Sequence, residues 1–226
     1  MSRVCAAPAA LLFPQRTVCH ACGVPLCAGE GLLCGACARS LAQCALLPEG
    51  AVNVPDRSVS YAVSAFAYEG AAAALVKALK FGADYTAALP LAEGMAAVYA
   101  AHPPLCGAEL CAAVPVHPRR MRRRGYNQAA VLADAFAQIT GIRRAPDVLT
   151  RVHHKRSQVG QGRAARRRNI AGAFAVSQPG AELIRGRKIL LIDDVLTTGA
   201  TAGECAETLL AAGAQAVLVL TAAYAL

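Results

Sequence analysis

The stretch from 190 to 203, LLIDDVLTTGATAG, constrains the fold of this chain more than any other. An apolar run ends in two adjacent acids, Asp193 and Asp194, and a Thr-Thr-Gly-Ala-Thr sequence then leads into residues that favour helix. A strand that passes through a short turn into a helix is the repeating unit of α/β folds. We therefore expect this stretch to lie at the carboxyl end of a strand in a mostly parallel sheet, where such proteins bind their ligands.

The same stretch predicts a ligand with two chemically different parts. The first amides of a helix have no partners inside the helix and carry partial positive charge, so they bind phosphate. Gly199 would let the backbone approach that phosphate closely, and the neighbouring threonines would add hydroxyl donors. A phosphate would repel Asp193 and Asp194, and we expect them to bind sugar hydroxyls or a divalent cation instead. Ribose 5-phosphate combines both parts.

Two other interpretations explain less of the stretch. Adjacent aspartates also follow a strand in phosphoacceptor receiver domains, but there the pair comes early and TTGAT does not follow it. An ordinary N-capped helix explains Thr198 alone. Neither interpretation accounts for the whole string.

Strands and helices alternate along the rest of the chain. This alternation predicts an α/β fold, with a mostly parallel sheet covered by helices on both faces. We expect strands at 60–68, 110–116, around Val148, at 188–192 and at 216–222. We expect helices at 69–81, 86–101, 124–141 and 201–212, and a long basic loop at 151–169.

The net charge of +9 comes from one part of the chain. Between Arg119 and Arg168 there are 14 Lys/Arg and 2 Asp/Glu, which gives +12, whereas the remaining residues carry 9 and 12, which gives −3. Such a segment suits a polyanionic partner, either a nucleic acid or a ligand with several phosphates. A solvated basic surface is the alternative.

Two CxxC pairs near the amino terminus predict a metal site. Cys19 and Cys22 form the first pair, Cys34 and Cys37 form the second, and eleven residues separate the pairs. Four thiolates in a closed tetrahedral site favour structural zinc. Iron–sulfur binding, disulfides and redox thiols are the alternatives. Three other potential donors lie nearby, namely His20, Cys27 and Cys44.

The cysteine-rich part predicts a small zinc-binding module at 1–50, followed by a linker to about residue 57 and a second domain at 58–226. The later cysteines, Cys106, Cys111 and Cys205, lie in alanine-rich surroundings and are predicted to be buried. No apolar run is long enough to cross a bilayer, and prolines interrupt the weakly signal-like amino terminus. We therefore expect a cytoplasmic protein without a membrane segment.

Four stretches carry a family resemblance. ILLIDDVLTTGATAGECAETL resembles the phosphoribosyl diphosphate (PRPP) motif of type I phosphoribosyltransferases. LLFPQRTVCHACGVPL, VPVHPRRMRRRGYNQAAVLA and KRSQVGQGRAARRRNIAGAF resemble the zinc knuckle, the RGxNQ segment and the basic loop of the ComF/GntX family of phosphoribosyltransferase-like proteins. Gln161 and Ala165 depart from the usual pattern of that loop. The resemblance implies a type I phosphoribosyltransferase fold with an amino-terminal zinc module of four cysteines.

The resemblance and the chemistry together assign roles to individual residues. Asp193 and Asp194 would accept hydrogen bonds from the ribose hydroxyls and stabilise an oxocarbenium-like transition state. The 5-phosphate would be held by Thr197, Thr198, Gly199, Ala200 and Thr201. Magnesium would help to hold the diphosphate. The basic residues expected to do so are Arg119, Arg120, Arg151, Lys155 and Arg156.

Two functions follow from these assignments. The first is Mg²⁺-dependent transfer of a phosphoribosyl group from PRPP to an acceptor that the sequence does not name. The second is a non-catalytic module that senses PRPP or binds single-stranded DNA through 119–168, since the resemblance implies a link to DNA uptake. Asn127 and Gln128 either stabilise the turn before their helix or contact the substrate. Lys77 and Lys80 are candidates for acceptor recognition only.

Overall fold

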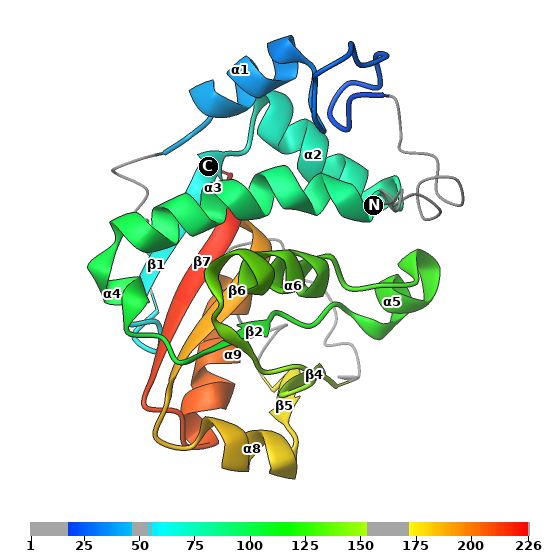
Figure 1. The fold of residues 1–226 in the computed structure, drawn as a ribbon. Helices are drawn as coiled ribbons and strands as arrows, with labels where there is room; N and C mark the ends of the chain where they lie inside the picture. The colour runs from blue at the N-terminus through cyan, green and yellow to red at the C-terminus, as the bar shows by residue number, and fades with distance from the viewer. Residues whose placement is uncertain (1–17, 47–53, 55, 153–171, 226) are drawn as a thin grey trace, which may run out of the picture.

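The computed structural model describes residues 18–46, 54, 56–152 and 172–225. Lys155, Arg156 and most of the predicted basic loop lie outside these residues. The described residues form a mixed α/β fold with a five-stranded parallel sheet and a two-stranded antiparallel sheet. The α/β prediction is therefore confirmed (Figure 1).

The parallel sheet has the strand order β1-β7-β6-β2-β3. The carboxyl ends of its strands meet at one edge, which is where ligands bind in such sheets. The strands are β1 (Tyr61–Ala67), β2 (Leu110–Ala113), β3 (Arg143–Arg144), β6 (Lys188–Leu196) and β7 (Ala216–Tyr224). The small antiparallel sheet pairs β4 (Leu149–Arg151) with β5 (Phe174–Val176).

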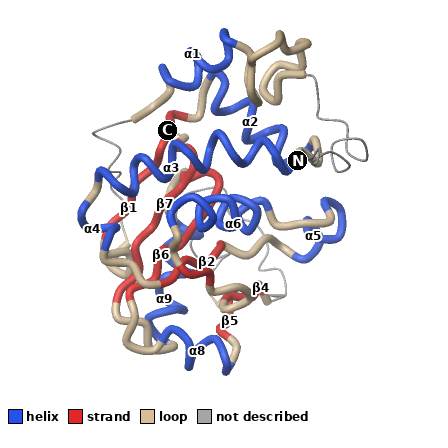
Figure 2. Tube along the Cα trace, in the orientation of Figure 1, coloured by secondary structure: helices blue, strands red, loops and turns tan. Residues whose placement is uncertain are grey.

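Helices cover both faces of the parallel sheet, and Figure 2 shows α3 and α6 on one side of the strands and α9 on the other. One face carries α2 (Gly70–Phe81), α3 (Ala88–Ala101) and α6 (Gln128–Thr140). The other carries α8 (Gln178–Ile184) and α9 (Ala200–Ala211). The shorter helices are α1 (Gly35–Gln43), η2 (Tyr85–Ala87), α4 (Pro103–Cys106) and α5 (Pro118–Arg124).

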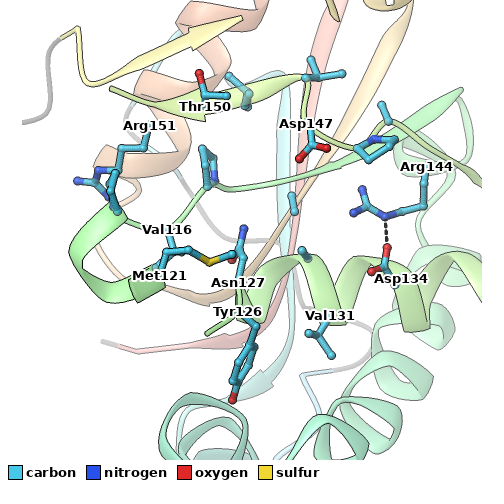
Figure 3. Close-up of a pocket in the computed structure, with 18 of the residues that line it drawn as sticks. Val116, Met121, Tyr126, Asn127, Val131, Asp134, Arg144, Asp147, Thr150 and Arg151 are labelled. Atoms are coloured by element: carbon cyan, nitrogen blue, oxygen red, sulfur yellow. Dashed lines mark hydrogen bonds and ion pairs between the residues drawn. The ribbon is translucent and has the colours of Figure 1, made fainter. Parts of the chain in front are cut away.

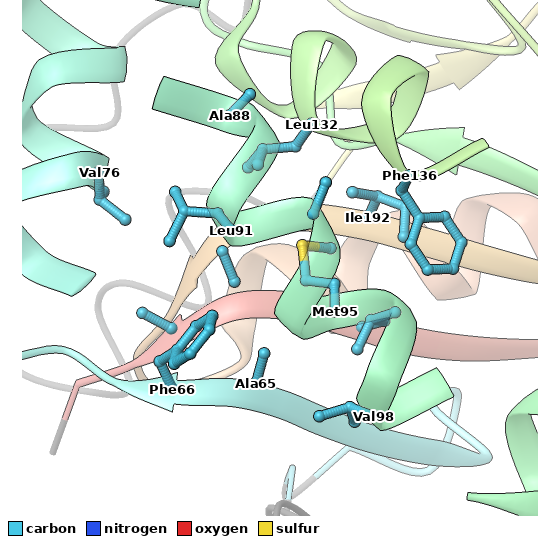
Figure 4. Close-up of a cluster of buried hydrophobic side chains, with 14 of the residues drawn as sticks. Ala65, Phe66, Val76, Ala88, Leu91, Met95, Val98, Leu132, Phe136 and Ile192 are labelled. Carbon is cyan, nitrogen blue, oxygen red and sulfur yellow. The ribbon is translucent and has the colours of Figure 1, made fainter. Parts of the chain in front are cut away.

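The apolar run in β6 is continuous because both faces of this strand are buried. Leu190 and Ile192 pack into the core beneath α3 and α6, whereas Ile189 and Leu191 pack into the core beneath α9. This alternation is the period-2 pattern of a strand. Figure 4 shows the first of these cores, where α3 lies against β1.

Close packing between α3 and β1 requires a glycine. A Cβ atom added to Gly94 would lie 2.2 Å from Cζ of Phe66, a distance that real structures do not tolerate. The Phe66 ring is buried, and it fills the space that a side chain at position 94 would otherwise take. This contact fixes how near α3 approaches the sheet.

The cysteine-rich segment packs onto the same core as β1 and α2. The backbone N–H of Ala67 donates to the carbonyl oxygen of Cys44 at 2.7 Å, and Leu46 N–H donates to Ala65 at 2.9 Å. Leu41 and Cys44 belong to the buried cluster beneath α3. The predicted boundary between a module at 1–50 and a domain at 58–226 stays a prediction, but the described parts of both share one hydrophobic cluster.

Several predicted elements need correction. The strand expected at 188–192 continues to Leu196, because its residues go on pairing with β7, so Asp193 and Asp194 lie within β6. The helix expected at 124–141 begins only at Gln128. Cys111 and Cys205 are buried as predicted, but the prediction was wrong for Cys106, which is exposed at the end of the short helix α4.

Candidate functional site

The two acids of β6 differ in their surroundings. Asp194 is buried, and its Oδ2 atom lies 2.8 Å from Nζ of Lys80, which extends from the carboxyl-terminal turn of α2. Asp193 is half-buried, and its Oδ1 accepts the backbone N–H of Asp194 at 2.9 Å. Only one of the two acids therefore has a lysine as its counter-ion among the described residues.

Asp193 holds its proton more tightly than an ordinary carboxyl group. Burial raises its pKa well above the usual range, and the neighbouring charge of Asp194 raises it further, while Lys80 acts in the opposite direction. Two adjacent carboxyl groups with one nearby cation repel each other, and a second cation or hydroxyl donors would stabilise their charged forms. That is the chemistry that ribose hydroxyls and Mg²⁺ would supply.

The turn after β6 leads into α9 as the sequence predicts. Gly199 is the N-cap of α9 and has a φ of 75°, which is in the left-handed region that favours glycine. A Cβ atom at this position would also lie 2.5 Å from Cγ1 of Val54, so the glycine accommodates a packed side chain. From the sequence, Gly199 was expected to let the backbone approach a ligand. The structure adds two local reasons for a glycine here, namely the positive φ and the contact with Val54.

Arginines of α5 face the acids across one cavity of about 530 Å³. The helix begins at Pro118 after its N-cap His117, whose Nδ1 accepts the backbone N–H of Arg119 at 3.1 Å. Arg120, Arg123 and Arg124 line this cavity together with Asp193 and Asp194. Positions i, i+3 and i+4 share a helix face, so the run PRRMRRR presents one basic face to the acids.

The predicted site residues are brought together in part. Asp193, Asp194, Thr197, Thr201, Arg120 and Arg151 line the cavity. Thr198, Gly199 and Ala200 belong to the adjoining turn and the first residue of α9, and Arg119 is exposed and does not line the cavity. Lys155 and Arg156 lie outside the described residues. The sequence analysis named Lys80 only as a candidate for acceptor recognition, and it did not place Tyr68, Phe81, His117, Arg123 or Arg124 in this site.

Asn127 and Gln128 have structural partners. The Asn127 side chain accepts the N–H of Ala129 at 3.1 Å and donates to the carbonyl oxygen of Val114 at 2.9 Å, so it caps α6 and ties it to the end of β2. Gln128 accepts a hydrogen bond from Arg124 and lines the cavity. The Asn127 side chain therefore has a structural role, which it exerts at the start of α6 rather than within the Arg-Gly-Tyr turn.

The cysteine cluster has the geometry of a closed metal site. The Sγ atoms of Cys19, Cys22, Cys34 and Cys37 all lie within 4.8 Å of one another, and those of Cys22 and Cys34 are 3.8 Å apart. A tetrahedral Zn²⁺ with Zn–S bonds of about 2.3 Å would separate its sulfurs by about 3.8 Å. The four thiolates therefore fit zinc, and the other described donors do not join them.

The alternative donors have other surroundings. The thiol of Cys44 donates to the carbonyl oxygen of Glu69 at 3.4 Å, and Nδ1 of His20 lies 2.6 Å from Oδ2 of Asp84. Cys27 is exposed, and its backbone N–H donates to Glu30 at 2.7 Å. Glu30 also accepts the N–H of Gly35 at 2.8 Å, so it braces the loop between the two pairs.

Backbone amides prepare one thiol of the cluster for metal binding. Burial by itself raises the pKa of Cys19, but the amides of Cys34, Cys22 and Ala21 outweigh it and lower this pKa to about 6. Burial, followed by the neighbouring thiols, raises the pKa of Cys37. The backbone amides thus favour the thiolate form of Cys19, which is the form that binds a metal.

Within the described residues, no helix combines the length and the apolar character that a bilayer-spanning segment requires.

Two solved structures overlap in part with this fold. The chain matches glutamine PRPP amidotransferase from B. subtilis in complex with ADP and GMP, with 19% identity and a TM-score of 0.41 over 61% of this chain and 26% of that chain. It matches an allosteric regulatory enzyme of purine biosynthesis with 20% identity and a TM-score of 0.39 over the same shares. TM-scores this low carry no weight in assigning the function.

Sequence relatives cover nearly the whole chain. The DNA utilization protein YhgH of Salmonella typhi is 31% identical over 220 residues, which is 89% of this chain and 94% of the relative. YhgH of Escherichia coli K12 is 28% identical over the same shares, and competence protein F of Haemophilus influenzae is 34% identical over 106 residues, or 47% and 46% of the two chains. A search of protein-family models gives no match. The relatives and the four motifs agree, and the chain therefore belongs to the ComF/GntX family, which includes these DNA utilization and competence proteins.

Proposed function

We propose that the protein binds PRPP with Mg²⁺ in the cavity between β6, α9 and α5, and transfers its phosphoribosyl group to an acceptor. One observation supports this most strongly. Two acids suited to ribose hydroxyls, the turn into a helix N-terminus and three arginines of α5 all border the same cavity. The arrangement matches a ligand with a diol in the middle, a monophosphate at one end and a diphosphate at the other.

The reaction would place opposite charges on opposite sides of the cavity. The bond from C1 of the ribose to the diphosphate oxygen breaks, and its electron pair leaves with the diphosphate. A bond forms from the acceptor to C1, and the acceptor's proton passes to the departing diphosphate or to water. Asp193 and Asp194 would stabilise the positive charge at C1, while Arg120, Arg123 and Arg124 would stabilise the leaving group.

Metal ions would have two separate roles. Mg²⁺, bound with PRPP, would neutralise diphosphate charge while keeping several waters. Zinc, held by Cys19, Cys22, Cys34 and Cys37, would be structural, because all four positions of the site are filled by protein thiolates.

Calorimetric titration of PRPP in the presence and absence of Mg²⁺ tests the binding. We expect the double variant Asp193→Asn plus Asp194→Asn to weaken binding at least about tenfold, since hydrogen bonds to charged groups contribute about 1.5–3 kcal/mol each. Glu207→Gln, an exposed acid on α9, is the matched control and should change nothing. Equal affinities of the wild type and the double variant would refute the assignment of the acids.

Catalysis needs its own measurement. Diphosphate release should appear when PRPP, Mg²⁺ and the right acceptor are present in a panel of nucleobases and amines. Binding of PRPP without release across a broad panel would favour the sensing function over the transfer function.

Single-stranded DNA binding is a second candidate function, and one observation favours it. The sequence offered few aromatic side chains beside the basic segment, but the fold brings two exposed ones close to α5. Phe81 is 70% exposed and Tyr85 is 52% exposed, and the Arg124 guanidinium lies 5.5 Å from the centre of the Phe81 ring. Tyr85 contacts Tyr126, at 4.6 Å between ring centres. Arginines beside exposed rings form the kind of surface on which bases stack.

This second candidate would agree with the names of two relatives, DNA utilization protein YhgH and competence protein F. Phe81→Ala plus Tyr85→Ala should weaken binding to a fluorescent oligothymidylate, because stacking contributes about 1–3 kcal/mol per base. Arg123→Ala should weaken it and reduce its salt dependence, whereas Arg185→Ala, at the end of α8, serves as the exposed control. Affinity that does not change with salt would exclude the arginines of α5 as its source.

A further inference from the structure

A second cavity lies on the other side of α5. It encloses about 730 Å³, which is within the range of small-molecule sites. The two cavities meet at Pro115, Val116 and Arg151, which line both. Figure 3 shows the second cavity between α6 and the segment that leads into β4. None of the residues assigned to the ribose or the 5-phosphate lines it.

The walls of this cavity are largely apolar, and most of its polar side chains already have partners. Asp134 accepts from Nε of Arg144 at 2.6 Å, so these two charges cancel. Asn127 uses both ends of its amide on the backbone. Thr150 donates to the carbonyl oxygen of Ala175 at 3.3 Å, away from the cavity. These contacts within the protein leave the groups less available to a ligand than a side chain without a partner.

Asp147 is the exception among the acids. Its exposed carboxylate points into the cavity in Figure 3, and no ion pair or hydrogen bond joins it to another of the described residues. Its φ of 54° lies in the left-handed region, which non-glycine residues adopt at a cost of roughly 1 kcal/mol. Asparagine and aspartate tolerate this conformation best. The backbone thus presents a carboxylate with both oxygens available.

The charges around the cavity restrict what this carboxylate can bind. With Asp134 and Arg144 paired, Asp147 contributes −1, and Arg122 and Arg151 contribute +2. A cationic ligand would be repelled by the two arginines. A neutral ring with two parallel N–H donors satisfies a carboxylate without adding positive charge, and guanine presents such a pair on its Watson–Crick edge.

The geometry points to a guanine-binding site in this cavity, with Asp147 accepting the ring N–H and the amino group of the base. The apolar side chains of Val116, Met121 and Val131 would cover the faces of the ring. This inference goes beyond PRPP binding, because its ligand lies on the opposite side of α5 from Asp193 and Asp194. If the protein does not bind guanine, PRPP binding can still be tested separately, and the reverse also holds.

Calorimetric titration of the full-length protein with guanosine tests the inference. Guanosine has no 5-phosphate, so binding in the PRPP site is not expected. We expect guanosine to bind roughly tenfold or more tightly than adenosine, because a bidentate contact to a base edge discriminates by about 1–3 kcal/mol. Inosine, which lacks the amino group, should lie between them. Equal binding of guanosine and adenosine, or no binding of guanosine, would overturn the inference.

Two variants locate the binding. Asp147→Asn keeps the shape and tolerates the left-handed backbone, but it replaces one acceptor with a donor, so guanosine affinity should fall roughly tenfold. Glu207→Gln removes an exposed carboxylate elsewhere and should change nothing. Val131→Phe should weaken binding by filling the cavity, while Asp193→Asn plus Asp194→Asn should not affect it. Unchanged guanosine affinity in Asp147→Asn would show that the carboxylate has no part in binding.

Discussion

Replacing Lys80 with methionine should lower the free energy of unfolding by about 2 kcal/mol at pH 7. Nζ of Lys80 lies 2.8 Å from Oδ2 of Asp194, and the side chains are 22% and 6% exposed. Removing one partner of a buried ion pair costs about 3–5 kcal/mol, because the other charge stays buried without compensation. The partial exposure of Lys80 lets water screen the charge that remains, which reduces the expected loss.

A double-mutant cycle separates the ion pair from the packing of the lysine stem. Methionine retains most of the apolar length of lysine, so the packing of the side-chain stem should change little. In Asp194→Asn the lysine can turn toward water, and we expect a smaller loss of about 1 kcal/mol. The double variant should recover part of the stability lost in Lys80→Met, with a coupling energy of about 1 kcal/mol or more.

Urea unfolding of the four proteins at pH 7, followed by circular dichroism, gives these free energies. Lys77→Met is the matched control, because Lys77 lies on the same helix but is exposed, and its loss should stay within about 0.5 kcal/mol. If the effects of Lys80→Met and Asp194→Asn simply add, the two side chains do not interact in solution. The explanation of the site as an acid pair balanced by a lysine would then fail.

Three further changes test other parts of the structure. Asp193→Asn should stabilise the protein at pH 7 but not at pH 3, because burial and Asp194 raise the folded pKa of Asp193. The stability that protonated Asp193 contributes is complete below the unfolded carboxyl pKa of about 3.9, and it is lost as the pH rises through the folded pKa. Equal shifts of the urea midpoint at both pH values would contradict this prediction. Gly94→Ala should lower the free energy of unfolding by about 1–3 kcal/mol through its clash with Phe66, and adding Phe66→Leu should recover part of that loss. If the effects of the two substitutions simply add, the clash is excluded. Zinc chelation should lower the melting temperature of the wild type but not that of the double variant Cys22→Ser plus Cys34→Ser, which should contain less than one zinc per chain. A wild-type melting temperature that chelation does not change would rule out a structural metal.

The sequence predicted the elements whose pattern is local. Buried parallel strands leave long apolar runs, and β6 and β7 are visible for that reason. The two CxxC pairs identify the cysteine cluster, because a knuckle brings its two thiols together without help from the rest of the chain. Helix α5 was missed because PRRMRRR has no apolar stripe, since its residues face cavities and solvent on all sides.

Contacts between distant segments could not be predicted. Nothing near Lys80 in the sequence indicates that α2 ends beside β6, more than a hundred residues later, and only the packing of α2 and β7 into one core brings them together. The aromatic side chains beside α5 were missed for the same reason, because Phe81 and Tyr85 belong to a segment that comes well before the basic one. Once α5 is known to be a helix, its periodicity places Arg123 and Arg124 on the same face as Arg120, because they follow it at i+3 and i+4.

The position of α5 explains how one short basic helix can border two different cavities. Its arginines at 120, 123 and 124 face the acids of β6, whereas Met121 and Arg122 line the cavity that contains Asp147. The rotation of α5 about its axis decides which side chains face which cavity, and contacts at both ends of α5 fix this rotation. His117 caps the first turn, and Gly125, with a φ of 85°, donates its N–H to the carbonyl oxygen of Met121 at 2.7 Å. A non-glycine residue at position 125 would strain this turn, and it should therefore disturb both cavities at once.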